Sequence, residues 1–203
     1  MLTHPKHWLL PLLLFTSVPG FAESVGEELA RSALKRTEFS VVYDGSYRVI
    51  PYPGGDVPAN LGVCTDVVIR AYRGVGIDLQ QRVHEDMLAH FDLYPSRRLW
   101  GLRKPDTNID HRRVPNLQRF FERHGTVLAV TSNPDDYQTG DIVTWKLPRN
   151  LPHIGIVIGQ KSGSSGIPLI VHNIGRGPEV EDGLFAYSIT GHYRYLPDQG
   201  GVM

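Results

Sequence analysis

The hydrophobic pattern of this chain changes its period near residue 126. Before that point, apolar residues recur at spacings of three and four, which predicts helices. After it, short apolar runs alternate with turns rich in Gly, Pro and Asn, which predicts strands. A run of helices followed by a run of strands favours the α+β class, with the N-terminal helices packed on an antiparallel sheet or half-barrel.

Capping signals set the expected helix starts. Ser24 and Glu27 have the spacing of a capping box, and Asp78 is a second plausible N-cap. Residues 94–113 show no clear period, and we expect them to be irregular. The helices are expected to start after Ser24, near Cys64, after Asp78 and near Pro115.

The second half of the chain is expected to form strands joined by short loops, in the manner of a meander. An additional extended piece is expected at residues 38–43. The predicted strands cover residues 126–131, 141–146, 153–159, 168–172 and 192–196.

The first 22 residues have the features of a secretory signal. Lys6 precedes an almost wholly apolar run from Trp8 to Val18, and small residues end the segment at Gly20 and Ala22. We therefore expect a signal peptide at 1–22, a single catalytic domain at 23–203, and a periplasmic or secreted bacterial protein. The apolar run is too short for a spanning helix of about 20 residues, so no membrane association is expected after cleavage.

The charge balance argues against a nucleic-acid partner. The chain has 21 basic and 21 acidic residues, and loss of Lys6 with the signal would leave 20 against 21. Nucleic-acid binding requires a concentrated basic surface. We expect a monomer that uses no cofactor or metal.

Cys64 is the single cysteine of the chain. An exported protein normally pairs its cysteines, so a lone thiol is either an inert core residue or a reactive group. Its position at a predicted helix start favours the thiolate, which is the nucleophilic form. The backbone N–H groups of such a turn can also stabilise an oxyanion.

Two histidines on neighbouring predicted strands could complete a catalytic site. His153 opens a strongly apolar strand and is the candidate base, while His172 ends the next strand and could orient it. Asn173 is the alternative third member, because adjacent strand residues face opposite ways. Cys64, His153 and His172 could instead bind zinc with an open fourth position.

Several motifs resemble those of the NlpC-type papain-like cell-wall peptidases and amidases. They are the Tyr52-Pro53-Gly54-Gly55 turn, the sequence VCTDVV around Cys64, the strand GDIVTW and the strand HIGIVIG that begins at His153. The segments VCTDVVIRAYR, DTNIDHRR and LPHIGIV further resemble a bacterial branch catalogued only as a domain of unknown function.

The resemblance implies a cysteine hydrolase that cleaves an amide bond, with peptidoglycan stem peptides as the expected substrate. Cys64 would be the nucleophile, His153 the base and His172 the third member, with Tyr52 supporting the oxyanion site. Val63-Cys64-Thr65-Asp66 departs from the usual Asp-Cys-Ser-Gly, which changes the expected substrate contacts.

Polar residues elsewhere were candidates for substrate binding. Asp66 follows the nucleophile, while Asp106, Arg112 and Arg113 belong to a loop that could hold charged peptide groups, or could serve folding instead. A further alternative keeps the fold without the reaction and makes the protein a peptide- or glycan-binding module.

Overall fold

A computed structural model of the protein describes residues 24–196 and confirms the α+β class. The predicted signal peptide at 1–22 lies outside the described residues. Within the described part of the chain, no helix has both the length and the apolar character needed to cross a membrane. The α-helices are α1 (Val25–Arg36), α2 (Cys64–Gly74), α3 (Leu79–His90), α4 (Ser96–Trp100) and α5 (Val114–His124).

The larger sheet has six strands in the order β3-β8-β4-β5-β6-β7. Strands β4 to β6 form the predicted antiparallel meander, β7 extends it by one strand, and β8 returns to pair with β4 and β3. A separate parallel pair consists of β1 (Val42–Tyr43) and β2 (Leu61–Gly62). The six strands are β3 (Thr126–Val127), β4 (Ile142–Leu147), β5 (Leu151–Lys161), β6 (Pro168–His172), β7 (Glu179–Glu181) and β8 (Ser188–Arg194).

The predicted capping signals are present at the helix starts. Ser24 and Glu27 form a reciprocal capping box on α1, and the Asp78 side chain accepts a hydrogen bond from the N–H of Gln80 at the start of α3. These side chains satisfy amide donors that have no partner within the helix. Local sequence therefore fixes where both helices begin.

The segment predicted to be irregular contains more structure than expected. Residues 94–113 include α4 and the 3-10 turn Asp110–Arg112, both too short to give a periodic signal. Strand β7 was not predicted, because its three residues alternate Glu-Val-Glu and contain no apolar run. Residues 188–194 form the last strand instead of residues 192–196, and β3 covers only two residues of the predicted 126–131.

The sheet separates two apolar clusters. One face packs against the helices and contributes Ile154, Ile156 and Val171 to the main core. The opposite face carries Trp145 and Val157 in a smaller cluster. Alternation along each strand produces this division, since neighbouring side chains point to opposite faces. Any side chain on β5 therefore lies either among the helices or on the far side of the sheet.

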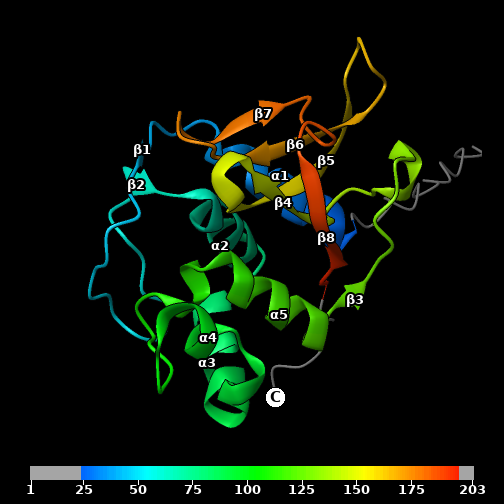
Figure 1. The fold of residues 1–203 in the computed structure, drawn as a ribbon. Helices are drawn as coiled ribbons and strands as arrows, with labels where there is room; N and C mark the ends of the chain where they lie inside the picture. Colours follow the sequence, from blue (N-terminus) through cyan, green and yellow to red (C-terminus); the bar gives the residue numbers. More distant parts are fainter. Residues whose placement is uncertain (1–23, 197–203) are drawn as a thin grey trace, which may run out of the picture.

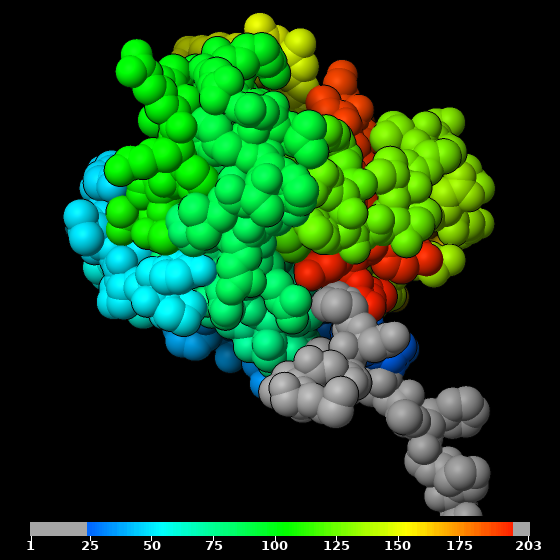
Figure 2. Space-filling model, turned by 90° about the horizontal axis from the view of Figure 1, so that it is seen from below, coloured from blue at the N-terminus to red at the C-terminus, as the bar shows by residue number. Residues whose placement is uncertain are grey.

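The helices and the β1–β2 segment lie over the face of the sheet that contributes to the main core. Figure 1 shows α3, α4 and α5 below the strands, with β1 and β2 at the left beside the start of α2. Seen from below, the green helical segments occupy the centre of the surface, and the cyan segment lies at its edge (Figure 2). The N-terminus of α2 is thus close to the β1–β2 pair.

Asp141, the residue before β4, anchors β8 through its buried carboxylate. It accepts hydrogen bonds from His192 at 2.8 Å and from Arg194 Nε at 2.7 Å, while His192 also contacts the carbonyl of Ala129 at 3.1 Å. Burial alone would raise the pKa of Asp141, but these hydrogen bonds outweigh it and place the pKa below its ordinary value. From the sequence we expected Asp141 only to begin a strand.

Replacing Asp141 with alanine should lower the free energy of unfolding by about 3–5 kcal/mol, because Arg194 loses its buried partner. Urea unfolding followed by tryptophan fluorescence measures this. Asp135→Ala, which removes an exposed pair with Lys161, should cost less than about 1 kcal/mol. The difference between wild type and Asp141→Ala should shrink as pH falls below about 4, since a lowered carboxyl pKa stabilises only the ionised protein. Equal costs for the two variants would contradict an anchoring role.

Candidate active site

Cys64 is the first residue of α2, as the sequence predicted. Its Sγ is approached by the backbone N–H of Thr65 in the same turn and by the backbone N–H of Ile154 on β5. The thiol is buried, with 4% of the residue exposed. Cys64 therefore lies against β5 at Ile154, the residue that follows His153.

A buried ion pair holds the turn that carries Cys64. Arg112 donates from Nε to Asp66 Oδ1 at 2.8 Å and from Nη2 to Oδ2 at 2.9 Å. Asp66 also accepts from the N–H of Val63 at 2.7 Å, which caps α2. Both charged residues are buried, so the structure corrects the expectation that Asp66 and Arg112 bind substrate: they position the nucleophile turn.

The tyrosine beside the thiol is Tyr43 and not Tyr52. The Tyr43 hydroxyl lies next to Sγ of Cys64, and burial with that contact raises the pKa of Tyr43. Tyr52 is 41% exposed, and its ring packs edge-on against His84 with centroids 4.9 Å apart. The resemblance-based role of Tyr52 is therefore not supported, because its Gly-Gly turn leads away toward α3.

Tyr43 gave little signal in the sequence. It follows Val41 and Val42 in a short extended piece, and nothing in the spacing links it to Cys64. Pairing of β1 with β2, which ends just before Cys64, creates the contact. The contact between Tyr43 and Cys64 could have been predicted only from the parallel pairing of these two very short strands.

Burial keeps the thiol protonated in this state. It raises the pKa of Cys64 to about 11, more than the N–H groups of Ile154 and Thr65 lower it. The expectation of a thiolate from the helix start alone is therefore corrected, because the helix terminus lies inside the core. At neutral pH the Cys64 thiol is therefore in its protonated form.

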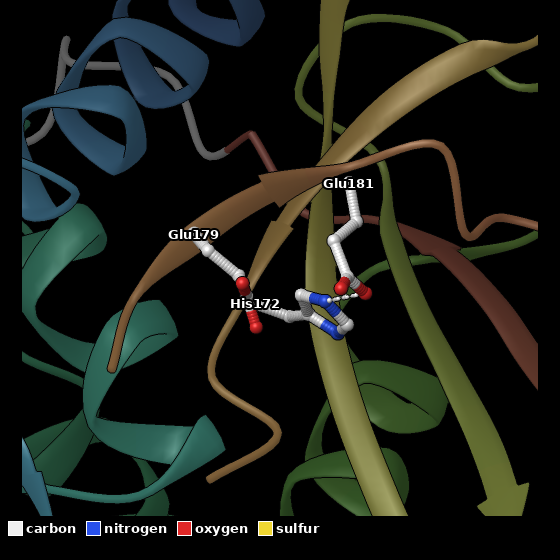
Figure 3. A group of neighbouring side chains, drawn as sticks. All are labelled: His172, Glu179 and Glu181. Atoms are coloured by element: carbon white, nitrogen blue, oxygen red, sulfur yellow. Dashed lines mark hydrogen bonds and ion pairs between the residues drawn. The ribbon is translucent and has the colours of Figure 1, made fainter. Parts of the chain in front are cut away.

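His153, His172 and Glu181 form a hydrogen-bonded relay. His153 Nε2 and His172 Nδ1 are 2.8 Å apart, and His172 Nε2 is 2.8 Å from Glu181 Oε2. Figure 3 shows the His172 ring directed at the carboxylate of Glu181 on the adjacent strand. The sequence predicted the two histidines as a pair but not Glu181, which lies on the unpredicted strand β7.

The relay fixes which nitrogen of His153 is basic. An ionised Glu181 can only accept, so His172 carries its proton on Nε2 and accepts through Nδ1. His153 must then donate through Nε2, which leaves a lone pair on Nδ1. Burial, and secondarily the His172 charge, lowers the pKa of His153 to about 3, so the ring is neutral at physiological pH.

The thiol and the base approach β5 from opposite faces. Ile154 belongs to the core cluster shared with Cys64, whereas His153 pairs across strands with Trp145 on the far face. Among the described residues there is no hydrogen bond between Sγ and the His153 ring. Proton transfer between Sγ and the His153 ring therefore requires a bridging water or a rearrangement at the start of β5.

Asn173 does not take the place of His172. Its Oδ1 accepts from the N–H of Gly175 at 3.0 Å and of Gly177 at 3.2 Å. The His153 ring is hydrogen-bonded to His172 instead. His172 is therefore the residue that the structure brings to His153, as predicted, while Asn173 holds the following loop.

The three residues considered for zinc do not converge on a common point. A direct hydrogen bond of 2.8 Å between the two imidazoles leaves no space for an ion between them. His172, Glu179 and Glu181 do cluster, as Figure 3 shows, with ligand atoms within 4.8 Å of one another. Arg176 already forms ion pairs with Glu179 at 3.1 Å and with Glu181 at 2.6 Å. Its guanidinium therefore supplies the positive charge that a metal cation would otherwise provide.

Of the two remaining candidates, Asp106 lies at a separate groove of about 600 Å³ and Arg113 does not line it. Asp106 lines it and accepts a hydrogen bond from the Tyr47 hydroxyl at 3.1 Å. Arg113 stacks over Trp100 at 4.1 Å and pairs with Asp110 at 3.2 Å. Asp106 also accepts from the backbone N–H and Nδ2 of Asn108 at 2.9 Å, so both candidates have protein partners and only Asp106 borders the groove.

Family comparison identifies the chain. Residues 30–195 match the model described as "Domain of unknown function (DUF1287)". The chain belongs to this family. It is also 50% identical over 168 residues to "Uncharacterized protein YijF" of Escherichia coli (strain K12), covering 83% of this chain and 80% of that protein. The predicted membership of a branch catalogued as a domain of unknown function is confirmed.

Two solved structures have a similar arrangement. They are titled "Structure of NlpC1 from Trichomonas vaginalis" and "Structure of NlpC2 from Trichomonas vaginalis". Both are 14% identical to this chain, with TM-scores of 0.46 and 0.45; the matches cover 92% and 87% of this chain. The chain spans about half the length of each, 49% in both cases. Both carry the NlpC name of the family that the motifs resemble.

Alkylation should report the protonation of Cys64. In the substrate-free protein we expect iodoacetamide to react slowly at pH 7 and about tenfold faster per pH unit toward pH 10, because burial holds the pKa near 11. The urea-unfolded chain should level off above about pH 9, following an ordinary thiol. Tyr43→Ala should speed the reaction by uncovering Sγ, whereas the exposed Tyr187→Ala should leave it unchanged. A plateau below pH 7 in the folded protein would show a thiolate instead.

Proposed function

We propose that the protein is a cysteine hydrolase that cleaves an amide bond, with Cys64 as nucleophile and His153 as general base. The observation that carries this proposal is the His153–His172–Glu181 relay, whose fixed tautomers leave a basic Nδ1 on the residue next to the thiol contact.

The reaction starts from a neutral thiol and a neutral imidazole. As Sγ bonds to the substrate carbonyl carbon, the thiol proton passes through a bridging water at the start of β5 to His153 Nδ1, and the carbonyl π electrons move to oxygen. Collapse of this intermediate expels the amine, which takes the proton from His153 and leaves a thioester. Water then attacks with His153 as base, and the carboxylic acid departs as the proton returns to sulfur.

The relay stabilises the imidazolium formed in the first step. A positive charge on His153 strengthens its hydrogen bond to His172, which in turn is polarised by the Glu181 carboxylate. Arg176 holds Glu181 from the other side at 2.6 Å and keeps the carboxylate directed inward. The buried imidazole can thus accept a proton that burial alone would disfavour.

Peptidoglycan stem peptides are the proposed substrate, and the periplasm or the extracellular space the proposed location. The support is the resemblance of the nucleophile and histidine motifs to cell-wall peptidases, together with the signal-like residues 1–22. No nucleic acid, cofactor or resident metal has a part in the proposal, and the protein acts as a monomer.

The raised thiol pKa also supports a second candidate, a binding module that retains the fold without turnover. Such a module would bind stem peptides with unchanged affinity when Cys64 is replaced by alanine. Absence of any product from wild type, together with that unchanged affinity, would establish it.

Purified stem peptides incubated with the protein and analysed by mass spectrometry test the hydrolase. Cys64→Ala should abolish cleavage, and His153→Ala should reduce it by about 10²–10⁴, the range for loss of a general base. His90→Ala, at an exposed position on α3, is the matched control and should retain full activity. Cleavage by Cys64→Ala would reject the proposal.

Glu181 and Glu179 provide a paired test of the relay. Both bind Arg176 and lie on the same strand and face, but Glu181 alone of the two hydrogen-bonds His172. Glu181→Gln should reduce kcat about tenfold or more, because it removes the charge that stabilises the imidazolium, while Glu179→Gln should stay within about threefold. Equal losses in the two variants would mean that Glu181 acts only through Arg176.

A further inference from the structure

Asn173 has an unused buried donor. The residue is fully buried, and its Nδ2 has no hydrogen-bond partner in the described part of the chain. Its Oδ1 accepts two backbone N–H groups, from Gly175 and Gly177, which fixes the orientation of the amide. An amide N–H₂ buried without an acceptor is costly and calls for an explanation.

The loop that follows β6 is shaped to present this amide. Gly175 and Gly177 both have positive φ, at 130° and 102°, which lets their two N–H groups converge on Oδ1. With the oxygen held on the loop side, the Nδ2 group is directed away from the loop. The sequence thus uses two glycines to orient a single amide.

Register places Asn173 beside the thiol. Ile156 pairs with Val171, so continuing the antiparallel register by two residues brings Asn173 opposite Ile154, whose N–H contacts Sγ of Cys64. Val171 lies in the core cluster with Cys64, and alternation puts Asn173 on the same face.

The same loop also returns to the strand that carries Tyr43. A side chain built on Gly177 would come within 3.3 Å of the carbonyl of Val41, two residues before Tyr43. The hydroxyl of Tyr43 covers the thiol. The loop that Asn173 holds through the N–H of Gly177 thus reaches the segment that leads to Tyr43.

We propose that Asn173 Nδ2 is an oxyanion donor of this site, and the inference rests on the hydrolase function proposed above. When Sγ adds to a carbonyl, the negative charge on oxygen would be shared between Asn173 Nδ2 and the backbone N–H of Cys64, one of the first-turn donors that have no partner within α2. Asn173, the alternative third member in the sequence analysis, thus takes the oxyanion-stabilising role that was expected for Tyr52.

A peptide aldehyde separates this role from a general effect on the thiol. The aldehyde adds to Sγ and forms a hemithioacetal oxygen at the oxyanion position, whereas iodoacetamide reacts at a saturated carbon and forms none. Asn173→Asp keeps an oxygen for the two glycine N–H groups but replaces Nδ2 with an acceptor. We expect the aldehyde dissociation constant to rise by about 10²–10³, the range for one oxyanion donor, with alkylation within about tenfold.

Asn133→Asp is the matched control, because Asn133 Oδ1 also accepts a backbone N–H but lies exposed at a distant turn. It should leave both measurements unchanged. Equal changes in aldehyde affinity and alkylation for Asn173→Asp would overturn the inference while leaving the hydrolase intact. A wild-type thiol that no peptide aldehyde blocks would reject the hydrolase itself, and the inference with it.

A measurement on the unmodified chain covers the case in which Asn173→Asp fails to fold. In a crystal structure of wild type with the bound aldehyde, the hemithioacetal oxygen should lie about 2.7–3.2 Å from Asn173 Nδ2. An oxygen directed to solvent or to Tyr43, with Nδ2 still without an acceptor, would overturn the assignment.

Discussion

The ion pair between Asp66 and Arg112 is the constraint on which the site depends. It joins the first turn of α2 to the 3-10 turn before α5, and Arg112 also reaches the carbonyls of Asp44 and Ser46 beyond β1. The Thr65 hydroxyl donates back to the Arg112 carbonyl at 3.2 Å. Three segments distant in sequence are thereby held around one buried carboxylate, and Cys64 lies at their junction.

Burial explains both the stability of this arrangement and its chemistry. A buried pair adds little net stability, but loss of one partner is severe, so such pairs mainly enforce one geometry. The same dry environment keeps the thiol and His153 neutral. In the proposed reaction, proton transfer between two neutral groups creates charge only as the substrate reacts, and the relay and the proposed oxyanion donor would then stabilise it.

The sequence predicted the parts of the structure that local signals determine. Capping residues predicted the starts of α1 and α3, and helical spacing placed Cys64 at the start of α2. Apolar runs predicted β5 and β6, and the pairing of His153 with His172 followed from these neighbouring strands. Tyr43 and Glu181 could not be predicted in the same way. Both lie on strands of two or three residues, whose partners are set by tertiary packing and leave no periodic pattern.

Arg112 and Asp66 show a different limit. Charged side chains are normally exposed, so from the sequence these two residues were interpreted as substrate contacts. Their burial shows that they form an ion pair with each other instead. Asn173 shows the converse case. From the sequence it was only the alternative third member, and the donor role proposed for it follows from which of its two amide atoms the backbone already occupies.

The position of Glu181 on an edge strand also affects how molecules of this protein meet one another. Strand β7 ends the sheet on one side with unpaired backbone groups, which in general invite a strand from a second chain. Its three residues are too few to template a ladder, and two of them are glutamates. The carboxylates of Glu179 and Glu181 therefore also discourage pairing with a second chain at this edge, so the strand that supplies a hydrogen-bond partner to His172 also protects the sheet edge.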